Sequence, residues 1–340
     1  MALIIYAPNV HTGGGKVLLQ ALAEQCGPRV QQAILDARLL QVADVPFIDI
    51  TSLWVRNTLA SRLTAEWKLW RNAKVGDTVL CLHSLPPLMP LRARTVVLVQ
   101  NRLLLEVGPL SQYPRGTRMR ITVERLWARY LQGRVKLYVV QTPSMADTLA
   151  QWLRRHVPTT VVPFAPHQPM PTCDDKPEKQ FDFIYPASGE AHKNHLRLLQ
   201  AWQMLASSGI QPRLALTVDA QRYPELTTYL AQQISLQGLA IRNLGELQPS
   251  QVNALYSQAG ALIFPSLLEA FGLPLIEAKQ HGLPILASEL DYVRDLTQPV
   301  QTFDPHSALS IARAVRRHMG VPEPIVQVMD GSYLLDEVLR

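Results

Sequence analysis

The sequence predicts an α/β protein built from two doubly wound domains, in which parallel strands alternate with helices. Short, continuous apolar runs alternate with segments of helical periodicity along most of the chain. This alternation stops in a proline-rich, charged stretch at 166–180 and then starts again. The chain has 340 residues, which is long for one compact core and suits two domains.

The first domain is predicted to span residues 1–168. Its strands are apolar at nearly every position, which is typical of a parallel sheet covered by helices on both faces. The predicted strands are 3–6, 78–82, 95–100, 136–141 and 159–164, and helical patterns lie near 16–25, 52–73, 115–132 and 144–156.

The second domain is predicted to span residues 180–320 and to repeat the same plan. Residues 321–340 are predicted to form a tail that packs back on the first domain. The predicted strands are 181–186, 213–218, 241–245, 261–266 and 284–288, and the helices are 193–208, 224–236, 249–259, 274–281 and 306–319. Ligands of such sheets bind outside the carboxyl ends of the strands, so two facing domains predict a ligand cleft between them.

Composition excludes several classes of protein. Hydrophobic residues make up 47% and charged residues 18%, which argues against disorder and against a coiled coil. No apolar run is long enough for a membrane-spanning helix, and the first residues lack the basic segment of a signal peptide. Cys26, Cys81 and Cys173 have no paired spacing and read as reduced thiols. We therefore expect a cytoplasmic protein.

Charge divides unevenly between the two halves. Residues 1–170 hold 20 Lys+Arg against 9 Asp+Glu, whereas residues 171–340 are acidic overall. The first half is therefore expected to meet something anionic: nucleic acid, an anionic membrane surface or a phosphorylated acceptor. Segments 52–73 and 115–134 combine cations with Trp54, Trp67 and Trp70, or with apolar residues at helical spacing. Such helices are typical of a membrane surface, and equally of ordinary helices that pack their tryptophans into the core.

The segment 265–286, PSLLEAFGLPLIEAKQHGLPIL, carries Glu269 and Glu277 in otherwise apolar sequence. Pro274 suits the start of a helix, and Gly282 suits its end. Glu269 then lies in the loop after a strand, and Glu277 lies in the first helical turn. An alternative role for Glu277 is to complement the helix dipole. The backbone N–H groups at this helix start, which can bind oxygen atoms, belong to Phe271, Gly272 and Leu273.

This segment resembles a family signature. EAFGLPLIE, followed by A-x3-G-x-P, is similar to the E-x7-E motif of family 4 glycosyltransferases, retaining enzymes of the GT-B fold, including those that build bacterial polysaccharides and O-antigens. The resemblance covers about residues 180–320. It implies that Glu269 contacts donor-sugar hydroxyls at the catalytic centre and that Glu277 binds the nucleotide ribose. The N–H groups of residues 271–273 would meet the sugar or diphosphate.

A second stretch, SGEAHKNHLRLLQAW at 188–202, places Lys193 at a predicted helix start. It resembles the family lysine that neutralises the donor diphosphate, a role that needs a fixed cation. The family arginine five residues earlier is replaced by Ser188, which leaves the second cation unassigned. His192 and His195 flank Lys193, but they lack a third ligand, so we predict no metal site. The chain also has no Asp-x-Asp pair.

In the first half, HTGGGKVLLQAL at 11–22 is similar to the glycine-rich first loop of GT-B enzymes, with Gly14 and Gly15 near the donor phosphate or the acceptor. A tight turn is the alternative. It does not match a P-loop, because Val10 and Val17 replace required residues. Where many family members have a histidine near the sugar, this chain has Gln100–Asn101–Arg102. Asn101 is the candidate there, and His83 is a further loop candidate.

The family resemblance implies a retaining glycosyltransferase without a cofactor, and the absence of an Asp-x-Asp pair favours one that is independent of a metal ion. Its donor would be a UDP- or GDP-sugar, and its acceptor a glycan or polyprenyl-linked glycan. The basic helices of the first half would hold it peripherally at the inner face of the cell membrane, and no nucleic acid is expected. A non-catalytic sugar-nucleotide-binding subunit and a sugar-nucleotide epimerase are the alternatives.

Overall fold

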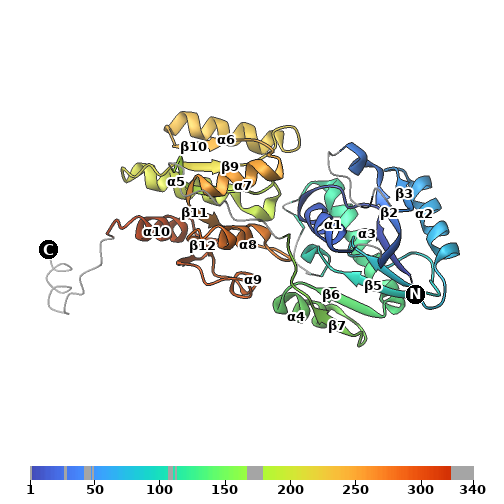
Figure 1. Cartoon of the computed structure of the whole chain (residues 1–340). Coiled ribbons are helices and arrows are strands. Elements are labelled where there is room, and N and C mark those ends of the chain that lie inside the picture. Colours follow the sequence, from blue (N-terminus) through green and yellow to red (C-terminus); the bar gives the residue numbers. More distant parts are fainter. Residues whose placement is uncertain are drawn as a thin grey trace, which may run out of the picture.

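A computed structural model describes residues 2–26, 29–41, 47, 50–105, 110–111, 113–166 and 179–322. It contains two separate parallel sheets, each flanked by helices, in two lobes that lie side by side (Figure 1). The predicted α/β class is therefore confirmed. Residues 167–178 of the predicted linker and residues 323–340 of the predicted tail lie outside the described residues, so the packing of the tail stays a prediction.

The first lobe has a seven-stranded sheet in the order β3-β2-β1-β4-β5-β6-β7, and its strands pair in parallel. The strands are β1 (Leu3–Ala7), β2 (Val30–Asp36), β3 (Ser52–Val55), β4 (Thr78–Cys81), β5 (Arg94–Leu98), β6 (Leu137–Val140) and β7 (Thr159–Val161). The α-helices are α1 (Gly13–Cys26), α2 (Leu59–Asn72), α3 (Arg115–Leu131) and α4 (Pro143–Trp152).

Alternate residues of the interior strand β1 face two different cores. Ile4 and Tyr6 pack in the core that includes Leu69 of α2 and Ala128 of α3. Ile5 packs on the other face, in the core that includes Leu19 of α1. Because side chains alternate along a strand, a strand buried on both faces is apolar throughout, as predicted.

One predicted helix of this lobe is wrong. Residues 52–73 were expected to be helical, but 52–55 form β3, which pairs with β2. Helix α2 begins only at Leu59, after Thr58, whose hydroxyl accepts a hydrogen bond from the backbone N–H of Ser61 at 3.3 Å. Trp54 therefore belongs to an edge strand. Strand β2 was not predicted, because polar residues interrupt its apolar run.

The second lobe has a six-stranded sheet in the order β10-β9-β8-β11-β12-β13, again with parallel pairs. Its strands are β8 (Phe181–Tyr185), β9 (Leu214–Leu216), β10 (Ile241–Asn243), β11 (Ala259–Phe264), β12 (Ile285–Ser288) and β13 (Gln301–Phe303). Its helices are α5 (His195–Ser207), α6 (Pro224–Gln237), α7 (Pro249–Ser257), α8 (Leu273–Gln280), α9 (Asp291–Arg294) and α10 (Ala308–His318). Strand β13 was not predicted, because its three residues are too short for a pattern.

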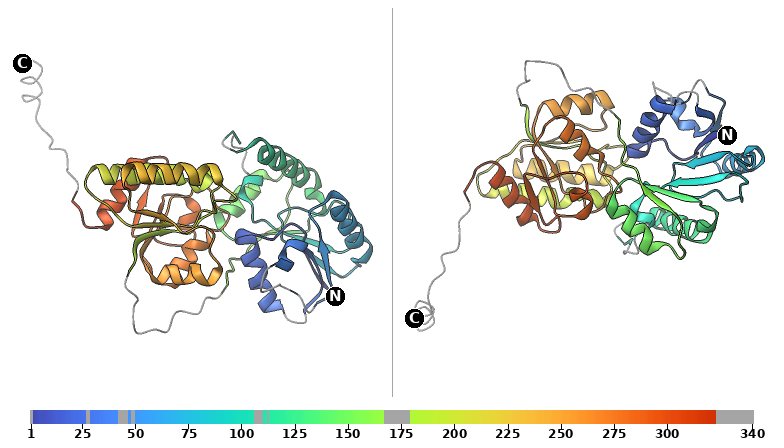
Figure 2. Two further views of the ribbon diagram at one scale, coloured as in Figure 1. Left: turned by 90° about the horizontal axis from the view of Figure 1, so that it is seen from above. Right: turned by 60° about the horizontal axis from the view of Figure 1, so that its bottom comes forward.

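The two lobes touch at several points, and Figure 2 shows their junction from two further sides. The backbone N–H of Ser144, in the first turn of α4, donates to Asp295 Oδ2 at 2.9 Å. The Tyr113 hydroxyl lies 3.2 Å from His192 Nδ1. None of the helices in the described part of the chain has the length and apolar character needed to cross a bilayer.

Candidate active site

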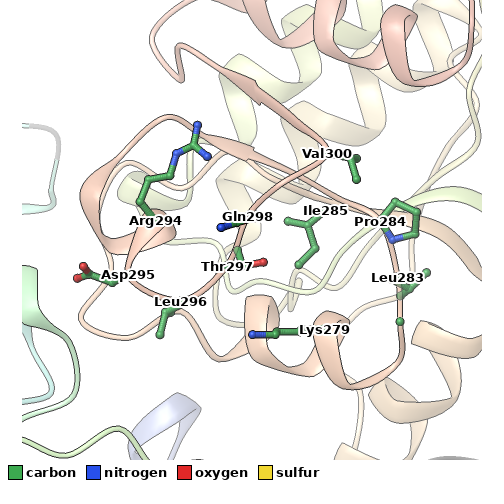
Figure 3. A pocket seen from close by; sticks show the side chains of 11 residues that line it. Lys279, Leu283, Pro284, Ile285, Arg294, Asp295, Leu296, Thr297, Gln298 and Val300 are labelled. Carbon is green, nitrogen blue, oxygen red and sulfur yellow. The ribbon is translucent and has the colours of Figure 1, made fainter.

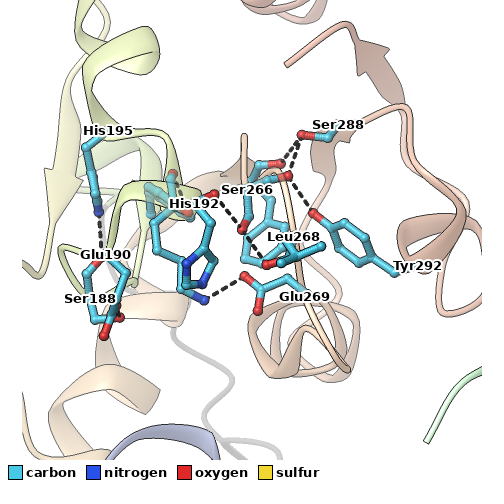
Figure 4. A network of polar contacts seen from close by, with 12 residues as sticks. Ser188, Glu190, His192, His195, Ser266, Leu268, Glu269, Ser288 and Tyr292 are labelled. Atoms are coloured by element: carbon cyan, nitrogen blue, oxygen red, sulfur yellow. Dashed lines mark hydrogen bonds and ion pairs between the residues drawn. The ribbon is translucent and has the colours of Figure 1, made fainter. Parts of the chain in front are cut away.

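The loops that follow β8 and β11 bring the two strongest candidate residues together. Lys193 Nζ lies 2.6 Å from Glu269 Oε1, and the two side chains are 17% and 11% exposed. Figure 4 shows Glu269 within the network of polar contacts around His192 and Ser266. Lys193 ends a short 3-10 helix (Ala191–Lys193) just before α5, not at the start of the helix as predicted. The two sheet-edge loops thus place a cation and an anion at one point.

Neighbouring hydrogen bonds fix this pair. Asn194 adopts a left-handed backbone conformation (φ 64°), and its side-chain N–H groups donate to the carbonyls of Pro265 and Pro305 at 3.0 and 2.7 Å. The carbonyl of His192 accepts from the Leu267 N–H at 2.8 Å, and the Tyr185 hydroxyl donates to the Lys193 carbonyl. The bonds to Pro265 and from Leu267 join the β8–α5 loop to the β11–α8 loop, and the bond to Pro305 ties it to the segment after β13, so Lys193 and Glu269 are held in place before any ligand arrives.

Glu277 occupies a separate position on α8. It is the fifth residue of that helix, so the prediction that it lies in the first turn is wrong. The Tyr256 hydroxyl donates to Glu277 Oε2 at 2.7 Å, and burial raises the pKa of this carboxyl. A carboxylate beyond the first turn gains little from the helix dipole. The dipole alternative therefore loses its main support, and the predicted ribose contact stays a prediction.

The predicted helix start is present at Gly272. This glycine precedes α8 with φ 76°, a conformation that glycine adopts without strain, and Gly282 has φ 65° after the helix end. Phe271 is buried, and Leu273 is the first helical residue. A Cβ placed on Gly14 would lie 3.4 Å from Leu273 Cδ1. The glycine-rich segment of the first lobe therefore directly faces the EAFGLP segment of the second.

Ser188, which stands where the family arginine is expected, belongs to a cluster that the sequence did not reveal. The hydroxyls of Ser188 and Tyr223 both donate to Glu190. Arg222 Nη2 lies 3.7 Å from Glu190 Oε1, and its guanidinium lies over the Tyr223 ring. Burial alone would favour the protonated acid, but these two hydroxyls and the charge of Lys193 lower the pKa of Glu190.

Gly189 makes this cluster possible. A Cβ at this position would lie 2.5 Å from Tyr223 Cγ, so only glycine lets the β9–α6 loop pack against the β8–α5 loop. Arg222, in the β9–α6 loop, therefore lies at the site although more than 25 residues separate it from Lys193 in the sequence. Burial, the charge of Arg38 and, to a smaller extent, the charge of Arg222 lower the pKa of His11 in the first lobe. Arg222 thus lies at the side of its lobe that faces the glycine-rich segment.

In the first lobe, α1 begins at Gly13, so the glycine-rich segment is the first turn of a helix. A Cβ on Gly15 would lie 3.0 Å from Gln100 Oε1 and 3.3 Å from Val10 Cγ1. Asn101 Oδ1 accepts from the Leu103 N–H at 3.1 Å and so caps a short 3-10 helix (Arg102–Leu104). This local cap explains Asn101 without a ligand, and its predicted catalytic contact stays a prediction.

His83, the other loop candidate, is neutral near pH 7. Burial lowers its pKa to about 4, and its ring lies edge-on to Tyr6 with 5.1 Å between centroids. A histidine with this pKa does not act as a cation at neutral pH. No described group of three or more His, Cys, Asp or Glu side chains is arranged to hold a metal ion.

An arginine pair lies at the carboxyl edge of the first sheet. Arg38 Nη2 contacts the buried Asp36 carboxylate at 2.6 Å. Arg38 Nη2 and Arg62 Nη2 also both donate to Asn9 Oδ1, at 3.3 and 2.9 Å. Asn9 lies in the loop after β1, Asp36 is the last residue of β2, and Arg62 is the fourth residue of α2. This group is therefore built from three segments. Sequence reasoning missed it.

Two cavities lie away from the Lys193–Glu269 pair. One of about 590 Å³ is lined by Lys279, Pro284, Ile285 and Val300, at the amino ends of β12 and β13 (Figure 3). A second, of about 490 Å³, lies between the lobes and is lined by Arg102, Ser144, Asp147 and Asp295 among others. Ligands of parallel sheets bind at the carboxyl ends, so the first cavity is on the wrong side of its sheet for the donor.

Comparison with solved structures identifies the fold as GT-B. Sucrose-phosphate synthase from Thermosynechococcus elongatus superposes with a TM-score of 0.69 at 15% identity, over 94% of this chain and 89% of that one. Anabaena HepE, solved with UDP and glucose, superposes with a TM-score of 0.66 at 16% identity, over 94% and 90%. At these identities the likeness shows the fold alone.

Sequence comparison finds similarity to glycosyltransferases in the second lobe. Residues 174–323 match the family model of glycosyl transferases group 1. O-antigen chain mannosyltransferase B of Escherichia coli is 31% identical over 109 residues, covering 32% of this chain and 28% of that protein. Serotype-specific mannosyltransferase WbdA of Escherichia coli is 29% identical over 153 residues, covering 42% and 17%. The chain thus spans less than a third of either relative.

Proposed function

We propose that the protein is a glycosyltransferase that moves a sugar from a nucleoside diphosphate sugar to a hydroxyl group of a glycan or lipid-linked glycan. The single observation that carries the proposal is the Lys193–Glu269 pair, held at the carboxyl edge of the second sheet. The match to glycosyl transferases group 1 covers this sheet. The relatives named as an O-antigen chain mannosyltransferase and a serotype-specific mannosyltransferase support a hexose donor and a glycan acceptor.

In the proposed complex, Lys193 turns its ammonium towards the donor diphosphate. Glu269 then accepts hydrogen bonds from sugar hydroxyls, and such bonds to a carboxylate are about twice as strong as neutral ones. The N–H groups of residues 271–273 face the sugar or diphosphate, and the Glu277 carboxylate accepts hydrogen bonds from the ribose hydroxyls. Burial raises the pKa of Glu277, and hydrogen bonds from two ribose hydroxyls would favour its ionised form.

Arg222 is the proposed second cation for the diphosphate. A diphosphate leaving group carries more charge than one ammonium neutralises, and Ser188 supplies none. Arg222 already lies beside Glu190 and acts on His11 across the lobe junction, so its guanidinium is close to the space between Lys193 and the glycine-rich segment. The two cations would carry the charge without a metal ion.

The proposed reaction retains the configuration of the anomeric carbon. The bond from this carbon to the donor phosphate oxygen breaks, and a bond to the acceptor oxygen forms on the same face. The proton of the acceptor hydroxyl passes to the departing phosphate oxygen. Lys193 and Arg222 stabilise the charge that develops on the diphosphate, and Glu269 orients the sugar.

A donor screen followed by a transfer assay tests the function. Thermal shift with UDP, GDP and their sugars is expected to give one base a clear rise in Tm, because a ligand of the folded state stabilises it by mass action. Incubation of that donor with polyprenyl-linked glycans is expected to give a lengthened glycan. Donor binding without transfer would favour the non-catalytic subunit, and an isomerised donor without acceptor would favour an epimerase.

A further inference from the structure

Helix α2 exposes a continuous apolar stripe. Four exposed apolar residues follow one another along this helix at spacings of four, four and three, which places them on one face of the helix. The first of them, Leu59, is 75% exposed. A neighbouring face of the helix buries Ala65, Glu66 and Leu69. The exposed stripe consists of Leu59, Leu63, Trp67 and Trp70.

Helix α3 repeats this arrangement. Its inward positions, Ile121 and Ala128, are buried. Its outward positions again form one helical face, and Met119 and Tyr130 are 71% and 76% exposed. The exposed stripe consists of Met119, Val123, Leu126 and Tyr130.

The two stripes belong to one side of the first lobe. Leu69 of α2 and Ala128 of α3 pack into the same core. Arg62 of α2 also acts electrostatically on Glu124 of α3. In Figure 2, left, α2 (blue) and α3 (green) lie along the outside of the lobe. We call the surface formed by the eight side chains of the two stripes the α2–α3 face.

In the two segments that carry this face, 56–74 and 115–134, the exposed charged side chains are cations. Glu66 is the only acidic residue in 56–74, and Glu124 is the only one in 115–134. Glu66 is buried and bonded to the Tyr6 hydroxyl, and burial raises the pKa of Glu124. The exposed cations of these segments are Arg56, Arg71, Lys74, Arg115 and Arg120.

This combination favours a lipid surface over a protein surface. Trp67 and Trp70 are nearly half exposed, so they do not fill the core as an ordinary amphipathic helix would require. Soluble proteins rarely leave so many large apolar side chains in one patch without a binding role. The cores of protein interfaces avoid charge, whereas helices that lie in a membrane interface combine Trp and Leu with flanking Lys and Arg.

We infer that the α2–α3 face docks on an anionic lipid bilayer. The apolar stripes would enter the boundary between headgroups and acyl chains, and the surrounding cations would meet the headgroups. Strands β3 and β5 are parallel, so α2 and α3 both begin on the carboxyl side of the sheet, where the glycine-rich segment lies. This orientation would present a lipid-borne acceptor to the lobe junction, a consequence that rests on the proposed function.

Vesicle co-sedimentation of the full chain tests the docking. The wild-type protein is expected to sediment with phosphatidylglycerol vesicles at low salt and to remain soluble with phosphatidylcholine vesicles. Raising the salt from about 50 to 500 mM is expected to weaken binding, because exposed charges are screened within about 10 Å at 0.1 M. Wild-type protein that ignores anionic vesicles at low salt would overturn the inference.

Matched variants locate the surface. Met119→Glu/Val123→Glu, and separately Arg115→Glu/Arg120→Glu, are each expected to lower vesicle affinity at least thirtyfold. The control variant Tyr229→Glu/Leu236→Glu alters two exposed apolar residues on α6 of the other lobe, and its vesicle affinity is expected to equal that of the wild type. All three variants should keep the wild-type Tm, since the altered side chains are exposed. Unchanged vesicle binding by both first-lobe variants would overturn the inference that the α2–α3 face is the docking surface.

Tryptophan quenching gives a local readout. Brominated phosphatidylglycerol is expected to quench the wild-type fluorescence, and Trp67→Phe/Trp70→Phe is expected to lose most of that quenching while still binding vesicles. Quenching that persists in this variant, or self-association of the wild type through this face in place of vesicle binding, would contradict the inference. Nucleotide-induced thermal shift, measured on the same proteins, is independent of lipid, so failure of the docking and failure of the proposed function are distinguishable.

Discussion

Lys193 Nζ lies 2.6 Å from Glu269 Oε1, although 76 residues separate the two in sequence. The contact exists because β8 and β11 are adjacent parallel strands, whose carboxyl ends open at the same edge of the sheet. The apolar segment 265–286 can therefore carry the Glu269 carboxylate, because the Lys193 ammonium compensates its negative charge. In the proposed reaction the same two groups bind opposite parts of one donor.

Their mutual compensation predicts a coupled effect on stability. Removing one partner of a buried ion pair costs about 3–5 kcal/mol, and partial exposure reduces this to about 1–2 kcal/mol here. Lys193→Met is expected to lower the free energy of unfolding by about that amount. Lys193→Met/Glu269→Gln is expected to recover most of it. Urea denaturation measures both, and a double variant as unstable as the sum of the two single variants would contradict the coupling.

The assignment of Arg222 predicts a rescue. Arg222→Gln is expected to weaken nucleoside diphosphate binding about tenfold or more, because the diphosphate loses one cation. Ser188→Arg in the Arg222→Gln background is expected to restore part of the affinity from the neighbouring loop. Arg242→Gln, at an exposed arginine of the same lobe, is the control. Calorimetric titration measures the series, and full affinity in Arg222→Gln would remove Arg222 from the site.

The glycine-rich segment predicts a difference between two adjacent glycines. A methyl group on Gly15 would press on Gln100 Oε1 at 3.0 Å, whereas one on Gly14 would make an ordinary contact with Leu273 at 3.4 Å. Gly15→Ala is therefore expected to cost about 1–2 kcal/mol of unfolding free energy, and Gly14→Ala less than half of that. Gln100→Ala should relieve Gly15→Ala. Equal losses for the two alanine variants would argue against this packing.

Two histidines, the half-buried His83 and the buried His195, predict loss of stability in mild acid. Burial lowers the pKa values of His83 and His195 to about 4, below the ordinary value of 6.5. In the unfolded chain these two histidines therefore bind protons below about pH 6.5, whereas in the folded protein they bind them only near pH 4. The free energy of unfolding is expected to fall across this window, by roughly 2–3 kcal/mol for each histidine.

His195→Gln checks this prediction. Its longer amide reaches the position of Nε2, which lies 2.8 Å from the Ser188 carbonyl, and can donate to that carbonyl without titrating. Urea denaturation between pH 7.5 and 4.5 is expected to show a shallower pH dependence for the variant than for the wild type. Identical slopes would contradict the prediction, because they would mean that His195 binds its proton over the same pH range in the folded and the unfolded protein.

The sequence was sufficient for the architecture because parallel strands buried on both faces leave continuous apolar runs, as in β8 and β11. It was insufficient at the sheet edges. Residues 52–55 were assigned to a helix because their strand character depends on pairing with β2, and the three residues of β13 are too short to show a period.

The candidate site divides in the same way. Lys193 and Glu269 were recognisable because each lies in a local motif. Arg222 and Glu190 were not, because their relationship depends on a contact between two loops that only Gly189 permits. The α2–α3 face was visible as a pattern of cations and tryptophans, but only the exposed fractions of Trp67 and Trp70 separate a docking face from a core-packed helix.

Calorimetric titration of Lys193→Met with the preferred nucleoside diphosphate, beside the corresponding nucleoside, tests the central claim most directly. The account predicts that the diphosphate loses at least tenfold in affinity relative to the wild type, while the nucleoside binds both proteins equally. Equal affinity of the diphosphate for the variant and the wild type would contradict it.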